Sequence, residues 1–207
     1  MTEKINIFYL QRQGLTFPVR LTHTMKIKTS DHHLVQAANQ GDSEAFAILL
    51  SRHYDLIHRL SFRMLGNSAD ADDMSQDICA VLPTKLRSFQ GNANFTTWLY
   101  RIVMNFAKDQ FRKQTTRRKV LTGWGDFYRM QQDEAVQKQG ELAWLSRAMS
   151  SLPNDLRQTV TLVLGEDLTH AQAAHLLEIS EGTVSWRMSQ VKKKLRVMAL
   201  EEEKTYE

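Results

Sequence analysis

The chain has 207 residues, of which 42% are hydrophobic and 24% are charged, so it can form one large or two small globular domains. It carries 27 Lys and Arg against 23 Asp and Glu, and the resulting net charge of +4 is compatible with a nucleic-acid partner. A single cysteine excludes an intramolecular disulfide framework, and no apolar run approaches the roughly 18 residues of a membrane span. With only 3 Pro and 9 Gly, and without a regular alternation of Val, Ile and Thr, the sequence predicts an all-α protein.

Two helices are predicted after an N-terminal extension. Residues 1–30 show little hydrophobic periodicity and are expected to form this extension. A short helix should follow at residues 31–39. After a turn, Asp42 or Ser43 is the candidate N-cap of a longer helix, whose apolar residues recur at helical spacing up to Met64. This spacing predicts that the longer helix buries one face.

The next helix begins with an acidic stretch at Asp70–Asp77. Carboxylates in the first turns of a helix interact favourably with its dipole. The same carboxylates could bind a cation or a basic partner, and the pattern leaves both interpretations open. Cys79 lies among apolar neighbours and is expected to be a small buried side chain. Pro83 falls inside the apolar pattern and predicts a kink or a break.

Residues 95–112 predict an amphipathic helix with one apolar and one basic face. The basic face carries Arg101, Asn105, Lys108 and Arg112. Thr96 or Thr97 is the candidate N-cap, and a polar loop flanked by aromatic residues precedes the helix at residues 89–94. Bases can stack on aromatic rings while phosphates meet cations, so this pattern suits single-stranded nucleic acid. A core helix with a solvated face is the structural alternative.

Periodicity fades between residues 115 and 139, which we interpret as a linker to a second helical module. The C-terminal part of that module is predicted to contain three elements in a recognisable order. A short helix at residues 168–177 is followed by a tight turn at residues 178–180 and a longer basic helix at residues 181–196. A short helix, a three-residue turn and a longer basic helix are typical of a helix-turn-helix.

The longer helix of this motif is expected to enter the major groove of duplex DNA. Its candidate contact residues lie away from the apolar stripe, and two of them carry positive charge. They are Thr183, Ser185, Arg187, Ser189, Gln190 and Lys193. The cations of this helix would meet phosphates and make binding dependent on salt. A helical hairpin with a solvated basic face is the alternative.

The sequence offers no pattern typical of catalysis. Its seven histidines are scattered, and it lacks a nucleophile–base arrangement, a phosphate-binding glycine loop and a site of paired carboxylates. We therefore expect no metal, no cofactor and no enzymatic activity.

Several motifs, in this order, resemble the extracytoplasmic-function (ECF) sigma factors of bacterial RNA polymerase. They are Gly41–Phe46 at the start of region 2, Ala71–Asp77 in its polymerase-binding helix, Phe89–Asp109 in its promoter-opening segment, and Leu152–Arg157 with Ile179–Arg187 in region 4. The resemblance covers residues 31–198. It divides the chain into an extension (1–30), region 2 (31–114), a linker (115–139), region 4 (140–200) and a tail (201–207).

The resemblance also implies roles for individual residues. Asp70, Asp73, Gln76 and Asp77 would bind the polymerase core. The minus-ten element would be bound by Asn94, Phe95, Trp98, Arg101, Asn105, Lys108 and Arg112. The minus-35 element would be bound by Thr183, Ser185, Arg187, Ser189, Gln190 and Lys193. The sequence departs from the family at Ser185 and Gln190, where Arg is common, and at Trp186, which replaces a small polar residue. These departures affect which promoter sequence would be recognised, and the implied role as a sigma factor stays the same.

A family member of this kind is a cytoplasmic alternative sigma factor, used in stress responses, that directs core polymerase to specific promoters and helps melt the minus-ten element. The implied partners are the RNA polymerase core, promoter DNA and an anti-sigma factor, without membrane insertion. Two other functions stay open at this point. One is a helix-turn-helix regulator that binds duplex DNA without polymerase, and the other is an interaction adaptor without a DNA role.

Overall fold

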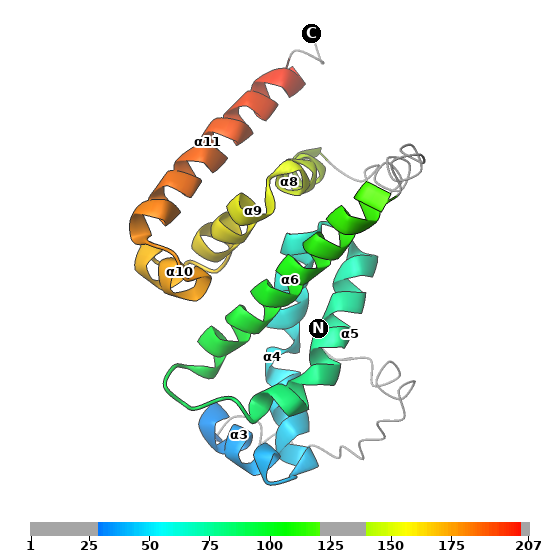
Figure 1. Ribbon diagram of the computed structural model, residues 1–207, viewed down its shortest axis with the longest axis vertical. Coiled ribbons are helices and arrows are strands. Elements are labelled where there is room, and N and C mark those ends of the chain that lie inside the picture. The colour runs from blue at the N-terminus through cyan, green and yellow to red at the C-terminus, as the bar shows by residue number, and fades with distance from the viewer. Residues whose placement is uncertain (1–28, 121–139, 204–207) are drawn as a thin grey trace.

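A computed structural model describes residues 29–120 and 140–203, and every regular element within these two ranges is a helix (Figure 1). The all-α prediction is therefore confirmed for this part of the chain. Most of the predicted extension, residues 121–139 of the predicted linker and the end of the tail lie outside the described residues. None of the described helices is both long enough and apolar enough to span a bilayer.

Among the described residues, four helices form the N-terminal module, with α4 at its centre. They are α3 (Asp31–Asn39), α4 (Ser43–Leu65), α5 (Ser68–Leu86) and α6 (Phe95–Val120). Asp42 caps α4 by accepting hydrogen bonds from the backbone N–H groups of Glu44 and Ala45, as the sequence predicted. Helix α4 packs against the other three helices around a core of fully buried side chains. This core includes Leu49, Ile57, Leu60, Met64, Met74, Ile78, Leu82, Leu86, Leu99 and Val103.

Two local features of these helices differ from expectation. Of the kink or break predicted at Pro83, the break is wrong, because α5 continues to Leu86. Proline removes one backbone hydrogen bond, but burial of Leu82 and Leu86 on either side holds the last turn, at about 1.5–3 kcal/mol for each buried side chain. Helix α6 begins at Phe95, so neither Thr96 nor Thr97 is its N-cap.

Helix α6 also continues to Val120, beyond the predicted start of the linker at residue 115. The basic segment that follows Arg112 is therefore helical as far as Val120. The module that carries the predicted minus-ten residues consequently ends in a 26-residue helix, which contains all of them except Asn94.

The C-terminal module contains α8 (Gly140–Ser151), α9 (Asn154–Val160) running into a π-helical turn η1 (Thr161–Gly165), α10 (His170–Leu177) and α11 (Glu181–Glu203). Thr169 caps α10 in a reciprocal capping box with Gln172. Glu178 adopts a left-handed conformation with φ 57°, which turns the chain sharply into α11. Helix α11 packs on α9 and α10 through its buried side chains, so the helix-turn-helix prediction matches this geometry.

The two modules lie against each other. Helices α4 and α6 contact α8, α9, η1 and α10, while α11 lies on the far side of the C-terminal module (Figure 1). Buried residues of both modules belong to one continuous hydrophobic cluster. The predicted reading helix α11 is thus kept at the outside of the molecule, whereas α10 is held next to α6.

Candidate nucleic-acid interface

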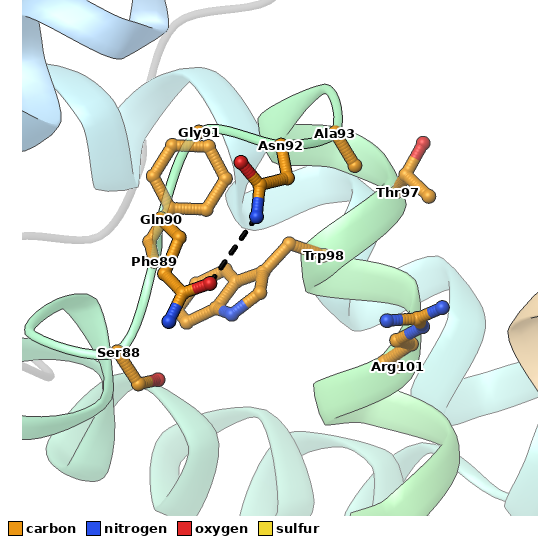
Figure 2. Close-up of a pocket in the computed structure, with 9 residues that line it drawn as sticks. All are labelled: Ser88, Phe89, Gln90, Gly91, Asn92, Ala93, Thr97, Trp98 and Arg101. Atoms are coloured by element: carbon orange, nitrogen blue, oxygen red, sulfur yellow. Dashed lines mark hydrogen bonds between the residues drawn. The ribbon is translucent and has the colours of Figure 1, made fainter.

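A small pocket opens at the start of α6. It has a volume of about 170 Å³ and is lined by Ser88, Phe89, Gln90, Gly91, Asn92, Ala93, Thr97, Trp98 and Arg101. Figure 2 shows the loop before α6 on one side of the pocket and the Trp98 indole projecting from α6 toward this loop. The loop requires glycine at Gly91, because its φ is +74° and an added Cβ would lie 3.0 Å from the ring of His32.

An aromatic cluster holds the Trp98 ring in place. Its ring centroid lies 5.3 Å from that of Phe95 and 5.5 Å from that of Phe89, and Phe95 is in turn 5.0 Å from the ring of His53. Phe95 is only 4% exposed, while Trp98 stays partly accessible at the pocket. Of the two aromatic residues that the sequence assigned to DNA, only Trp98 therefore offers a ring surface on which a base can stack.

Polar groups surround this ring. The Asn92 side-chain amide donates a hydrogen bond to the Gln90 side-chain oxygen at 3.2 Å (Figure 2). Asn94, which the sequence also assigned to the site, is exposed at the end of the loop. Amides at the edge of an aromatic platform can accept and donate hydrogen bonds to the edges of a base.

The predicted basic face of α6 is only partly free. Asn105, Lys108 and Arg112 are exposed along the helix, and Arg112 forms an ion pair with Asp109 at 3.6 Å. Arg101 is different, because its Nη2 hydrogen-bonds to the ring Nε2 of His175 on α10 at 2.9 Å. The structure therefore places three of these four side chains at the surface and directs the fourth toward the C-terminal module.

The acidic residues predicted to bind polymerase share the outer face of α5. Asp70, Asp73, Gln76 and Asp77 are all exposed. The Asp70 carboxylate accepts a hydrogen bond from the Nδ2 of Asn67 at 2.8 Å, so it also helps to cap the helix. Positions separated by three, four and seven residues form one stripe on a helix. The stripe is suited to a basic partner.

The outward face of α11 carries fewer of the predicted reading residues than the sequence suggested. Ser185, Ser189 and Lys193 are exposed. Thr183 is hydrogen-bonded to the hydroxyl of Ser180 at 2.9 Å. The side chain of Arg187 is only 17% exposed, with its Nε 3.6 Å from a carboxylate oxygen of Asp155 on α9. Gln190 is partly buried.

Trp186 is not among the DNA-contact residues predicted from the sequence, but it is exposed on α11. Its side chain is 58% exposed, which is unusual for tryptophan, and it lies on the same face of α11 as Ser189 and Lys193. The signal was present in the sequence, because these residues follow Trp186 by three and seven positions, which is the spacing of one helix face. An aromatic group therefore stands at the centre of the surface that would meet the groove.

Metal binding is not suggested by this part of the chain. Within the described ranges, no three His, Cys, Asp or Glu side chains gather in a way that could hold a metal ion. The arrangement instead combines a stacking pocket, cations along α6, an acidic stripe on α5 and a helix-turn-helix.

Comparison with known proteins places this arrangement in a family. The model of Sigma-70 region 2 matches residues 49–117, and that of Sigma-70 region 4 matches residues 142–195. The chain is 32% identical over 166 residues to the ECF sigma factor SigM of Mycobacterium tuberculosis, covering 80% of this chain and 83% of SigM. It is 27% identical over 173 residues to the ECF sigma factor SigW of Bacillus subtilis, covering 78% of this chain and 92% of SigW.

Two solved structures share the fold. One is CnrH in complex with the cytosolic domain of CnrY, with a TM-score of 0.58, 24% identity, and coverage of 83% of this chain and 97% of CnrH. The other is the sigma factor RpoE of Bartonella quintana in complex with the anti-sigma factor NepR, with a TM-score of 0.59, 19% identity, and coverage of 72% and 93%. The family models and the curated relatives together show that the chain belongs to the ECF family of RNA polymerase sigma factors.

Proposed function

We propose that this sigma factor uses three separate surfaces in promoter recognition. The acidic stripe of α5 docks on core polymerase, the pocket at the start of α6 holds an unpaired base of the minus-ten element, and α11 reads the minus-35 duplex. The pocket beside Trp98 is the observation that carries the proposal. A regulator that binds only duplex DNA has no use for a stacking surface next to exposed cations.

At the minus-ten element, a base of the non-template strand turns out of the duplex and stacks on Trp98. Asn94 and the amides of the loop contact its edge, while Asn105, Lys108 and Arg112 follow the strand along α6. Phe95 supports the indole from beneath instead of touching the DNA. Unstacking a base costs a few kcal/mol and stacking on an aromatic side chain returns about 1–3 kcal/mol. The two roughly balance, so strand opening needs the phosphate contacts and the docked polymerase as well.

At the minus-35 element, the N-terminal half of α11 lies in the major groove. Ser185, Trp186 and Ser189 face base edges, and Lys193 meets a phosphate. The indole of Trp186 suits the 5-methyl group of thymine, which is the apolar feature of that groove. Arg187 reaches DNA only if it leaves Asp155, so we assign it to fixing α11 on α9 in the free protein.

The chain acts by binding, and the chemistry of RNA synthesis belongs to the polymerase. Asp73, Gln76 and Asp77 present a negative surface for a positively charged helix of the core enzyme. The RpoE structure that shares this fold contains an anti-sigma factor, and we infer that a protein of this class also restrains this chain. We assign the protein to the cytoplasm, where polymerase and chromosome are found.

Transcription reconstituted from purified components tests the proposal. The chain is added to sigma-free core polymerase on a library of promoters, and run-off transcripts are sequenced. The expected result is a set of transcripts that depends on both proteins and shares two sequence elements. If the chain bound one duplex site tightly without core and gave no transcript from any promoter, the regulator alternative would replace this proposal.

A further inference from the structure

A histidine of α10 contacts the reading surface of α11. His170 is the first residue of α10, and its ring Nδ1 lies 3.0 Å from the Oγ of Ser185, within hydrogen-bond distance. The two residues are 15 positions apart and belong to the two helices of the helix-turn-helix. Ser185 is exposed and His170 is partly buried. A base can therefore reach the serine while the imidazole engages its hydroxyl group.

The direction of this hydrogen bond decides what Ser185 can offer to a base. A serine hydroxyl has a single hydrogen and two lone pairs, whereas a neutral imidazole has one nitrogen that donates and one that accepts. If Nδ1 accepts, the hydroxyl hydrogen is used, and the serine oxygen can only accept from a base. If Nδ1 carries the hydrogen and donates, the hydroxyl hydrogen is free to be donated to a base. The tautomer of His170 therefore sets the hydrogen-bonding character of Ser185.

The start of α10 favours the tautomer in which Nδ1 accepts. The first backbone N–H groups of a helix have no carbonyl partner within the helix, and they form its positive end. His170 lies at this end of α10, where the Thr169 hydroxyl accepts from the backbone N–H of Gln172 at 3.2 Å. By its covalent structure, Nδ1 is closer to the backbone than Nε2. A lone pair is more favourable than an N–H beside these positive groups, which places the ring hydrogen on Nε2.

We propose that His170 is a positioning residue for promoter recognition, which takes the hydroxyl hydrogen of Ser185 and leaves this serine as an acceptor. An acceptor pairs with the exocyclic amines of the major groove, which are N4 of cytosine and N6 of adenine. Guanine and thymine instead present carbonyl oxygens there. Two facing acceptors share no hydrogen, which is unfavourable once water is excluded.

Ser185 should therefore select cytosine or adenine over guanine and thymine at one position of the minus-35 element. This inference deepens the proposed function and rests on it, because it requires α11 to lie in the major groove. His170 acts through Ser185 and adds no base contact of its own.

Binding to a set of minus-35 duplexes tests the inference. The parent duplex comes from a promoter that the holoenzyme transcribes, and each position is replaced in turn by the other base pairs. Anisotropy with holoenzyme gives the affinities. Ser185→Ala identifies the position that Ser185 reads, because the base preference there should be lost. The wild type should favour cytosine or adenine at this position by about fivefold, the contribution of one hydrogen bond. A preference for guanine or thymine overturns the inference.

Two substitutions separate the hydrogen bond of His170 from its packing. His170→Phe keeps a ring but has no nitrogen, and His170→Ala removes the ring as well. Both free the hydroxyl hydrogen of Ser185, so the preference at the Ser185 position should fall to within about twofold. The control His175→Ala removes the imidazole at the other end of α10 and should keep the wild-type preference.

The comparison of these variants has outcomes that overturn the inference. An unchanged preference in His170→Phe shows that the ring packing is sufficient and the hydrogen bond is not needed. An equal loss of preference in His175→Ala shows that the effect is not specific to the contact with Ser185. Because each preference is a ratio of affinities within one variant, a general weakening of DNA binding does not alter it.

Nitrogen NMR of the full chain, with isotope-labelled histidine, determines the tautomer without DNA. The signals of His170 are identified by their loss in His170→Phe. In slightly alkaline solution, where histidine is ordinarily neutral, Nδ1 should resonate as an unprotonated nitrogen and Nε2 as a protonated one. The opposite tautomer overturns the inference, even if both substitutions of His170 impair folding.

Failure of the proposed function would give a different result. If the wild type discriminates between duplexes but Ser185→Ala changes no preference at any position, α11 does not read a base through Ser185. The assignment of Ser185 to base recognition would then be wrong, whereas the NMR result is independent of that assignment.

Discussion

Replacing Trp98 by alanine removes the surface on which the proposed everted base stacks. Stacking of one base on an aromatic side chain contributes about 1–3 kcal/mol, which corresponds to about 5- to 150-fold in affinity. We therefore expect Trp98→Ala to weaken binding of the single-stranded minus-ten oligonucleotide within this range. Binding of the minus-35 duplex should not change, because that surface lies on α11.

The substitution also disturbs the fold, and the size of this effect can be bounded. Trp98 lies 5.3 Å and 5.5 Å from two phenylalanine rings, and each aromatic pair contributes about 0.5–1.5 kcal/mol. These pair energies come in addition to the area that the ring buries, and truncating a fully buried tryptophan to alanine costs about 3–5 kcal/mol in total. Trp98 is partly exposed, so its loss should not exceed this range, which is below the stability of a typical domain, and the chain should remain folded. Trp98→Phe is the matched control, since it keeps a ring and should retain most of the binding.

The assay uses holoenzyme assembled with each variant. Fluorescence of 2-aminopurine placed in the minus-ten element reports strand opening, and anisotropy of a labelled duplex reports minus-35 binding. Trp98→Ala should open the promoter poorly while binding the duplex normally. Equal losses in the two measurements, or normal opening by the alanine variant, would refute the division of labour between α6 and α11.

Four further outcomes follow from the described residues. Replacing thymine by uracil in the minus-35 element removes one methyl group, which contributes about 0.8 kcal/mol when buried. The replacement should weaken binding of the wild type about fourfold and should leave binding of Trp186→Ala unchanged. Equal sensitivity of both proteins would rule out methyl recognition. Asp77→Lys should weaken binding to core polymerase about tenfold, whereas Asp55→Lys on α4 should not, as measured by competition for core. Burial raises the pKa of Cys79 to about 12, so an alkylating reagent at pH 8 should modify the thiol only after unfolding, and rapid labelling of the native chain would contradict its buried position. Burial raises the pKa of Glu166, but the hydrogen bonds and charges of Arg59, Tyr100 and Arg63 outweigh it and hold the pKa below its ordinary value of 4.5. The wild type should therefore be more stable than Glu166→Gln by an amount that is fully present above pH 4.5 and shrinks as the pH falls through the lowered pKa; a difference in free energy of unfolding that does not depend on pH would contradict this.

Most local features could be predicted from the sequence. Asp42 caps its helix as expected, because a cap depends on hydrogen bonds to residues two or three positions away. The turn at Glu178 and the buried stripe of α11 also depend on near neighbours and on helical spacing. The helix-turn-helix and the family could therefore be identified from the sequence.

Features that depend on contacts between residues far apart in the chain could not be predicted from the sequence. Pro83 predicted a kink or a break, but α5 is not broken there, because the side chains around Pro83 are buried. Phe95, which was assigned to the minus-ten element, is only 4% exposed and packs beside Trp98. Arg187 was assigned to the major groove by its position on the helix, and in the free chain it lies against Asp155 of α9.

The sequence by itself determined the helices, their caps and the presence of two DNA-binding modules, since these properties arise from short-range hydrogen bonds and from periodicity. Only the tertiary structure decided how the modules face each other. Arg59 and Glu166 are 107 residues apart in the chain, and they pair across the interface although only the Glu166 carboxylate is buried. No local pattern encodes such a contact, because the carboxylate is buried and receives its donors only once the modules have packed.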